Sequence, residues 1–193
     1  MLTACKANYH KANLYGDFTP SELKDLNKIV KFFKDETCGT ADFEKCFRQI
    51  NYDSLISKGM TLSSKIDFEK QKKLYRDISS STFDAIWMFC ESFYHPTQTK
   101  AEDLCLSTNR KYLNYLKAYG RDNPKIADYS KRLEGSGDFN HFDFDYREIL
   151  AEKEYFDLAD FNMQLVLAIH YLSLNDQSKR NADLRIQKYP NEK

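Results

Sequence analysis

The most constraining feature of this sequence is a nearly uncharged run, Phe156 to Leu174, in a chain that is otherwise rich in charge. Phe161, Leu165 and Leu172 recur in this run at helical spacing on one face, and the remaining faces are also apolar. A helix that is apolar on all sides is buried on most of them. We therefore predict that residues 156–174 form the central helix of the fold.

The composition around this run favours an all-α fold. The chain has only 6 glycines and 4 prolines, which suits helices joined by short connections. Apolar residues recur at helical spacing in several earlier stretches: residues 19–36, 41–50, 64–78, 83–94, 98–119 and a short segment from Pro124. We predict a single all-α domain of about seven helices packed around the C-terminal helix at about 156–174.

The distribution of polar residues predicts the limits of the domain. We expect residues 1–18 to form an N-terminal tether, residues 19–176 to form the helical domain, and residues 177–193 to form a polar C-terminal tail. Three polar residues interrupt the central apolar run: Asn162, Gln164 and His170. For this reason we interpret the run as a buried helix and not as a membrane span.

A short motif at the N-terminal end bears on the compartment. The residues Leu2-Thr3-Ala4-Cys5 resemble the lipobox of bacterial lipoproteins, in which a signal peptidase cuts before a cysteine that then receives a lipid. The resemblance covers these four residues, and no basic or apolar leader precedes them in the sequence. It implies an acylated Cys5 and a protein that is lipid-anchored in the periplasm or at the cell surface. The alternative is a cytoplasmic protein.

The other cysteines agree with an oxidising compartment. Four remain, Cys38, Cys46, Cys90 and Cys105, and an even number is typical of a disulfide framework. Four cysteines allow three pairings, of which proximity in sequence favours Cys38–Cys46 and Cys90–Cys105. The alternative is a cytosolic helical adaptor with reduced, buried thiols. The spacing lacks a C-x₂-C pair or a nearby pair of histidines, so we predict no metal site.

The charge balance and the missing motifs exclude several functions. Lys and Arg together number 29, as do Asp and Glu, so the chain has no general attraction for nucleic acid or an anionic membrane. The glycine-rich nucleotide loops and the G-x-S-x-G elbow are absent from the sequence. We therefore predict no cofactor and no nucleic-acid partner, with membrane contact through the lipid alone.

One group of residues has the composition of a catalytic or cation-binding site. It comprises Asp138, His141, Asp143, Asp145 and Glu148, with His170 as a further candidate. The favoured interpretation of the acids is a capped helix N-terminus, where carboxylates are stabilised by the helix dipole. A hydrolytic enzyme with a dispersed Asp/His site is the alternative, and it requires these groups to converge in one pocket.

These observations together favour a non-catalytic function. We predict a binding module for a protein or peptide partner, one form of which is an inhibitor or immunity-type lipoprotein. The chain contains 13 tyrosines, and a tyrosine presents a large apolar area with a polar tip to a partner. The candidate partner surface is the stripe formed by Tyr112, Tyr115 and Tyr119.

Overall fold

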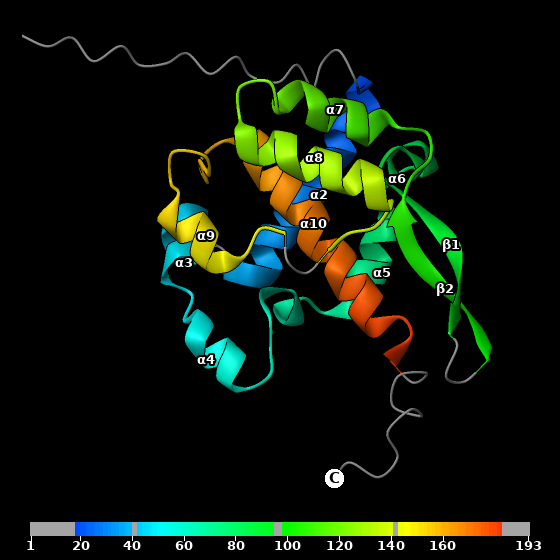
Figure 1. Ribbon diagram of the computed structural model, residues 1–193, viewed down its shortest axis with the longest axis horizontal. Helices are drawn as coiled ribbons and strands as arrows, with labels where there is room; N and C mark the ends of the chain where they lie inside the picture. The colour runs from blue at the N-terminus through cyan, green and yellow to red at the C-terminus, as the bar shows by residue number, and fades with distance from the viewer. Residues whose placement is uncertain (1–17, 40–41, 95–97, 141–142, 183–193) are drawn as a thin grey trace, which may run out of the picture.

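The structure, a computed structural model, describes residues 18–39, 42–94, 98–140 and 143–182 (Figure 1). The elements in chain order are α2 (Pro20–Cys38), α3 (Phe43–Gln49), α4 (Tyr52–Ser57), the 3-10 helix η1 (Leu62–Lys65), α5 (Phe68–Asp77), α6 (Ser80–Ile86), β1 (Trp87–Tyr94), β2 (Thr99–Leu106), α7 (Lys111–Tyr119), α8 (Pro124–Ser136), α9 (Tyr146–Ala151) and α10 (Phe161–Lys179). Helices form the body of the molecule, and the two strands lie along one side of it.

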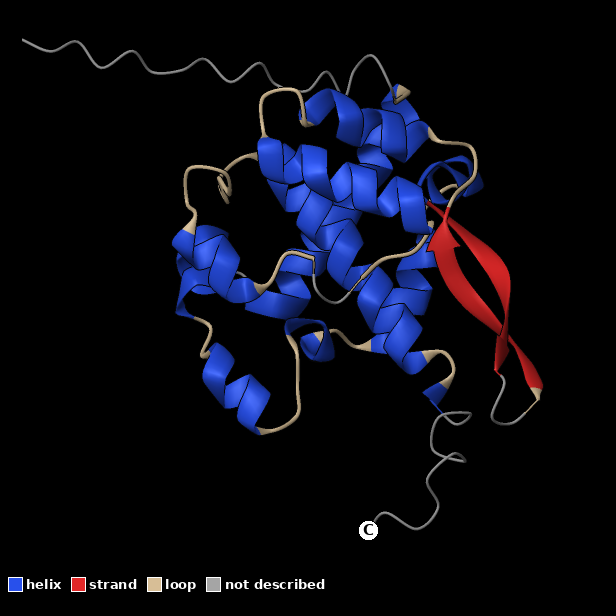
Figure 2. Ribbon diagram, in the orientation of Figure 1, coloured by secondary structure: helices blue, strands red, loops and turns tan. Residues whose placement is uncertain are grey.

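The all-α prediction is wrong, because β1 and β2 form a two-stranded antiparallel sheet (Figure 2). Trp87 at the start of β1 pairs with Leu106 at the end of β2. Both strands fall where the sequence predicted helices, at residues 83–94 and 98–119. The described ranges also contain nine α-helices where about seven were expected. The fold is therefore mixed, with a helical body and one hairpin.

The hairpin arises from a sequence that satisfies two periods at once. Phe83, Trp87 and Cys90 recur at helical spacing, whereas Trp87, Phe89 and Phe93 alternate with other residues at the period of a strand. Aromatic residues favour strands, where they pack against cross-strand neighbours. The strand period prevails here, with Trp87 buried and Phe89 and Phe93 exposed on the same face.

Helix α10 runs through the middle of the body, in agreement with the apolar run in the sequence (Figure 1). Asp160 caps it, and every residue from Asn162 to Asp176 is buried. Helix α2, η1, α5 and strand β2 all contact it. Within the described ranges, no helix combines the length and the apolar character needed to cross a lipid bilayer.

The folded part extends beyond both predicted domain limits. Phe18, which we assigned to the tether, is only 4% exposed and packs edge-on against Tyr115 with ring centroids 5.9 Å apart. Helix α10 continues to Lys179, and Gln177 and Asn181 hydrogen-bond to the backbone of β2. The rest of the predicted tether and most of the predicted tail lie outside the described residues.

Asp25 ties α2 to the start of α6. Its carboxylate accepts hydrogen bonds from the Ser79 backbone N–H at 2.8 Å and from the Thr82 hydroxyl at 3.0 Å, and it pairs with Lys28 at 2.6 Å. Burial alone would raise the pKa of the Asp25 carboxyl. The hydrogen bonds from Lys28, Ser79 and Thr82 outweigh burial and lower this pKa from 3.8 to about 2.

This arrangement predicts a specific loss of stability in acid. Unfolded Asp25, with its pKa near 3.8, binds a proton before folded Asp25, whose pKa is about 2. Its contribution to the free energy of unfolding is therefore complete above about pH 4 and is lost as the pH falls towards 2. Urea unfolding followed by circular dichroism should show a shallower decline across this window for Asp25→Asn than for the wild type. A parallel decline of the two proteins would contradict this role for Asp25.

Candidate functional site

A groove of about 430 Å³ lies where α5, α6, β1 and the end of α10 meet. We call it the aromatic groove and define it by Lys72, Tyr75, Arg76, Phe83, Phe89 and Arg180. It combines an apolar lining with cations from α5 and from the first residue after α10. Hollows of this kind, mostly apolar with a few polar groups, are the usual form of a binding site.

The aromatic lining is a continuous cluster of rings. Phe83 lies 5.4 Å from Tyr75 and 5.3 Å from Phe89, measured between ring centroids. Phe89 is 42% exposed, although it belongs to this cluster. An exposed aromatic side chain held in place by other rings offers apolar area to a ligand without having to be ordered first.

Arg180 joins the groove to the core. Its guanidinium carbon lies 4.4 Å from the centroid of the Phe89 ring, a cation–π contact. The same guanidinium donates to the buried Asp176 carboxylate, with Nε 2.6 Å from Oδ1 and a terminal nitrogen 2.9 Å from Oδ2. Burial raises the pKa of the Asp176 carboxyl, and the hydrogen bond from Arg180 works against this rise. Arg180 therefore neutralises a buried charge and positions an exposed ring.

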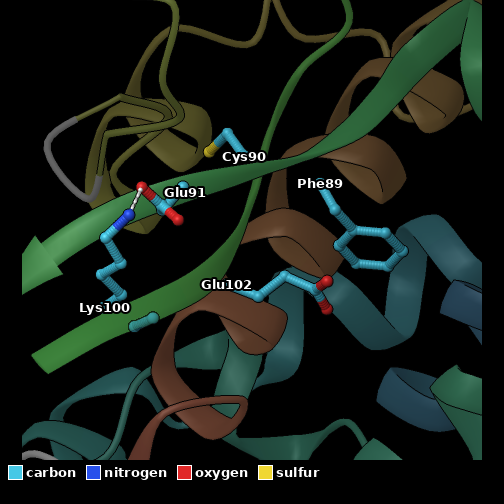
Figure 3. A pocket seen from close by; sticks show the side chains of 6 residues that line it. Phe89, Cys90, Glu91, Lys100 and Glu102 are labelled. Carbon is cyan, nitrogen blue, oxygen red and sulfur yellow. Dashed lines mark hydrogen bonds and ion pairs between the residues drawn. The ribbon is translucent and has the colours of Figure 1, made fainter.

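The face of the hairpin continues the groove as a shallow hollow of about 320 Å³ (Figure 3). Glu91 and Glu102 lie directly opposite each other in the strand register, an arrangement in which like charges are destabilising. Each glutamate has a separate cation: Lys100 lies 2.8 Å from Glu91, and Arg180 lies 3.3 Å from Glu102. These pairings leave the hairpin face close to neutral.

The cations of the groove are only partly neutralised. Lys72 pairs with Glu69 at 2.6 Å. Arg76 is exposed, and the part of the chain that the structure describes provides it with no ion-pair partner. Asp84 is the carboxylate that lines the groove beside these cations. Arg180 is paired with Asp176 and Glu102, so among the described cations of the groove Arg76 is the one open to a negative group of a ligand.

The tyrosine stripe that the sequence suggested lies inside the protein. Tyr112 and Tyr115 are 0% exposed, and Tyr119 is half-buried. The Tyr115 hydroxyl donates to Asn162 at 3.1 Å, and the Tyr119 hydroxyl donates to Asp160 at 2.9 Å. This corrects the expectation of an exposed stripe: α7 turns these residues towards the first turn of α10, where they serve the core.

The described acids of the candidate catalytic group do not converge. Each has a structural partner: Asp138 accepts from Gln177, Asp143 pairs with Arg132, Asp145 caps α9 and Glu148 pairs with Lys125. His141 lies outside the described residues. Among the residues that are described, no group of three His, Cys, Asp or Glu is placed to hold a metal ion. These carboxylates therefore stabilise the fold rather than line a shared pocket.

His170 is a core residue. It is 0% exposed, and its ring packs edge-on against those of Tyr129, Phe144 and Tyr171. The Tyr129 hydroxyl lies 3.3 Å from Nδ1 of the imidazole. A histidine enclosed in this way is separated from the aromatic groove, so it does not supply a base there.

The cysteines are paired as their proximity in sequence favoured. Cys38 and Cys46 have Cα atoms 5.8 Å apart and join α2 to α3, while Cys90 and Cys105 have Cα atoms 6.0 Å apart and join β1 to β2. Both separations are typical of disulfides. The second bond fixes the two strands directly behind Phe89. Cys5 lies outside the described residues.

Sequence reasoning missed the aromatic groove. Its members lie in α5, α6, β1 and the first residue after α10, so no local pattern connects them. Two signals were present: the alternation of Trp87, Phe89 and Phe93, and Arg180 placed four residues after Asp176. We had assigned the first to a helix and the second to a polar tail.

Comparisons of the chain with protein-family models, with curated proteins and with solved structures find no match. The features of this molecule that bear on its function are therefore its own geometry and chemistry. These are the aromatic groove, the hairpin face beside it and the two cross-links.

Proposed function

We propose that this protein is a non-catalytic binding module that holds a protein or peptide partner in the aromatic groove. The supporting observation is the exposed Phe89 ring, held by Phe83 and Arg180 beside the exposed cation of Arg76. Binding hot spots are enriched in aromatic residues and arginine, and they form where a rigid side chain meets a hollow. The groove combines these features.

We further propose that binding takes place outside the cytoplasm, on a protein anchored by a lipid at Cys5. Two cysteine pairs at disulfide distance support an oxidising compartment. The lipobox-like residues 2–5 support the anchor. An inhibitor or immunity-type lipoprotein, which meets its target in the periplasm or at the cell surface, is one form that such a module takes.

Intact mass of the native, membrane-extracted protein tests the compartment. We expect a diacylated or triacylated chain that begins at Cys5, with the other four cysteines alkylated only after reduction. A lipid-free chain that retains Met1 and has 5 alkylatable thiols would overturn this part of the proposal and restore the cytosolic adaptor.

Cross-linking in native cells tests the groove. We expect the cross-linked partner of the wild type to be reduced about tenfold or more by Phe89→Ser and by Arg76→Glu, because each removes a contact at the centre of the site. Lys131→Glu, an exposed lysine of α8, is the matched charge-reversal control and should retain the partner. Circular dichroism checks that each variant is folded. Retention of the partner by all three variants would exclude the groove as the site.

A further inference from the structure

The edge of β1 that faces away from β2 has the properties of a strand acceptor. We propose that the partner docks there as an extended peptide segment, with an apolar side chain in the aromatic groove and a carboxylate at Arg76. This inference rests on the proposed function and specifies the mode of docking and the chemistry of the ligand.

The strand register shows which backbone groups of β1 point outwards. The Ser107 N–H donates to the Ile86 carbonyl at 3.0 Å, so these two residues form a hydrogen-bonded pair. Hydrogen-bonded and non-hydrogen-bonded pairs alternate along an antiparallel ladder. It follows that Trp87, Phe89 and Glu91 belong to the other class, whose N–H and C=O groups point away from β2.

The opposite edge of the hairpin confirms this alternation and is already occupied. The residues of β2 that face Trp87, Phe89 and Glu91 all bond outwards to the body. The Leu106 N–H donates to the Gly137 carbonyl at 3.2 Å, while the carbonyls of Leu104 and Glu102 accept from Gln177 at 3.2 Å and from Asn181 at 2.9 Å. The β2 edge is thus occupied by the Gly137 carbonyl, by the Gln177 side chain of α10 and by the Asn181 side chain just beyond α10.

The β1 edge lacks such a cover. Trp87 directly follows α6, and its outward N–H donates to the Phe83 carbonyl of that helix. Beyond that point, no hydrogen bond from the described ranges reaches the outward backbone groups of Phe89 or Glu91. Each of these residues offers one donor and one acceptor, spaced two residues apart as a strand requires. Addition of a strand to such an edge is an established mode of peptide recognition.

The surroundings of this edge define the peptide. An added strand would lie about 4.8 Å from β1, so its side chains on the Phe89 face would enter the aromatic groove. The rings of Tyr75, Phe83 and Phe89 suit an apolar side chain. The exposed Arg76 suits a carboxylate. We therefore expect a ligand in which an apolar residue and an acidic residue are two positions apart, so that both side chains lie on the Phe89 face.

Proline substitution at Glu91 separates this docking mode from simple occupation of the groove. The hairpin does not use the outward N–H of Glu91, so Glu91→Pro removes a donor available only to a partner. Glu91→Gln is the matched control, because it also loses the charge that pairs with Lys100 but retains the N–H. The thermal midpoint of each variant shows that the hairpin remains folded.

The probe is a library of random 12-residue peptides displayed on phage and selected against the full chain. We expect enrichment of peptides that carry Asp or Glu two positions from an apolar residue. Measured by fluorescence anisotropy with the synthetic peptides, Glu91→Pro should weaken binding about tenfold or more, and Glu91→Gln should weaken it less than about twofold. Arg76→Glu should weaken the binding of acidic peptides and leave the binding of their neutral analogues unchanged.

The outcomes distinguish the inference from the function on which it rests. Binding that is lost in Phe89→Ser but unchanged in Glu91→Pro would overturn strand addition and leave the binding function in place. Two results would overturn both the docking mode and the binding function. One is failure to enrich any peptide, and the other is enriched peptides whose binding is unchanged by Phe89→Ser and by Arg76→Glu. A wild-type dimer that Glu91→Pro converts to a monomer would replace the peptide with a second copy of the chain as the occupant of the edge.

Discussion

Replacement of Arg180 by alanine is expected to destabilise the protein by about 3–5 kcal/mol, the effect of removing one partner from a buried ion pair. The variant leaves the carboxylate of Asp176 fully buried without its guanidinium. It also removes the cation from Phe89 and from Glu102. Guanidinium chloride unfolding at pH 7, followed by circular dichroism, measures the change.

The pH dependence of this variant identifies the cause. The loss of stability in Arg180→Ala should be smaller at about pH 4 than at pH 7. Burial raises the pKa of the Asp176 carboxyl, so at the lower pH a proton can neutralise the unpaired carboxylate. Lys179→Ala, the exposed neighbour in the last turn, should stay within about 0.5 kcal/mol of the wild type. Equal losses in both variants would instead indicate a general weakening of the end of α10.

Trp87→Ala is expected to destabilise the protein by about 3–5 kcal/mol through the cavity it leaves. The side chain is fully buried between the hairpin and the core, with its ring 5.4 Å from that of Tyr75. Its indole N–H donates to the Ser173 hydroxyl of α10 at 2.8 Å. The chain has 1 tryptophan, so circular dichroism rather than tryptophan fluorescence must follow the unfolding of this variant.

Two further variants of β1 test this explanation. Trp87→Phe retains most of the buried ring and loses the hydrogen bond, so it should be clearly more stable than Trp87→Ala. Phe93→Ala removes an aromatic side chain that is 46% exposed on the same strand face, and it should cost less than about 1 kcal/mol. If Phe93→Ala proved as damaging as Trp87→Ala, burial would not explain the role of the tryptophan.

Periodicity in the sequence was reliable where only one period was present. The helix predicted over residues 19–36 corresponds to α2, which begins at a capping box in which the Glu22 N–H donates to Thr19. Between residues 83 and 94 the aromatic residues satisfied both periods, and the outcome depended on packing against α6 and α10. Local patterns do not carry that information.

The candidate site was harder to predict than the fold. Helical spacing correctly grouped Tyr112, Tyr115 and Tyr119 on one face of a helix, but it could not show that this face meets α10. The aromatic groove depends on the contact between Phe89 and Arg180, which are far apart in the chain. Only the cysteine pairing could be predicted from the sequence, because the two members of each pair are close together in the chain.

The central helix also separates the groove from the Phe18 end of the described chain. At its start, Asn162 bonds to Tyr115, against which Phe18 packs, and just beyond its end Arg180 borders the groove. A helix of 19 residues is about 28 Å long, so these two places lie well apart. A ligand in the groove therefore does not touch Phe18, and any effect of binding on that end of the described chain would have to pass along α10.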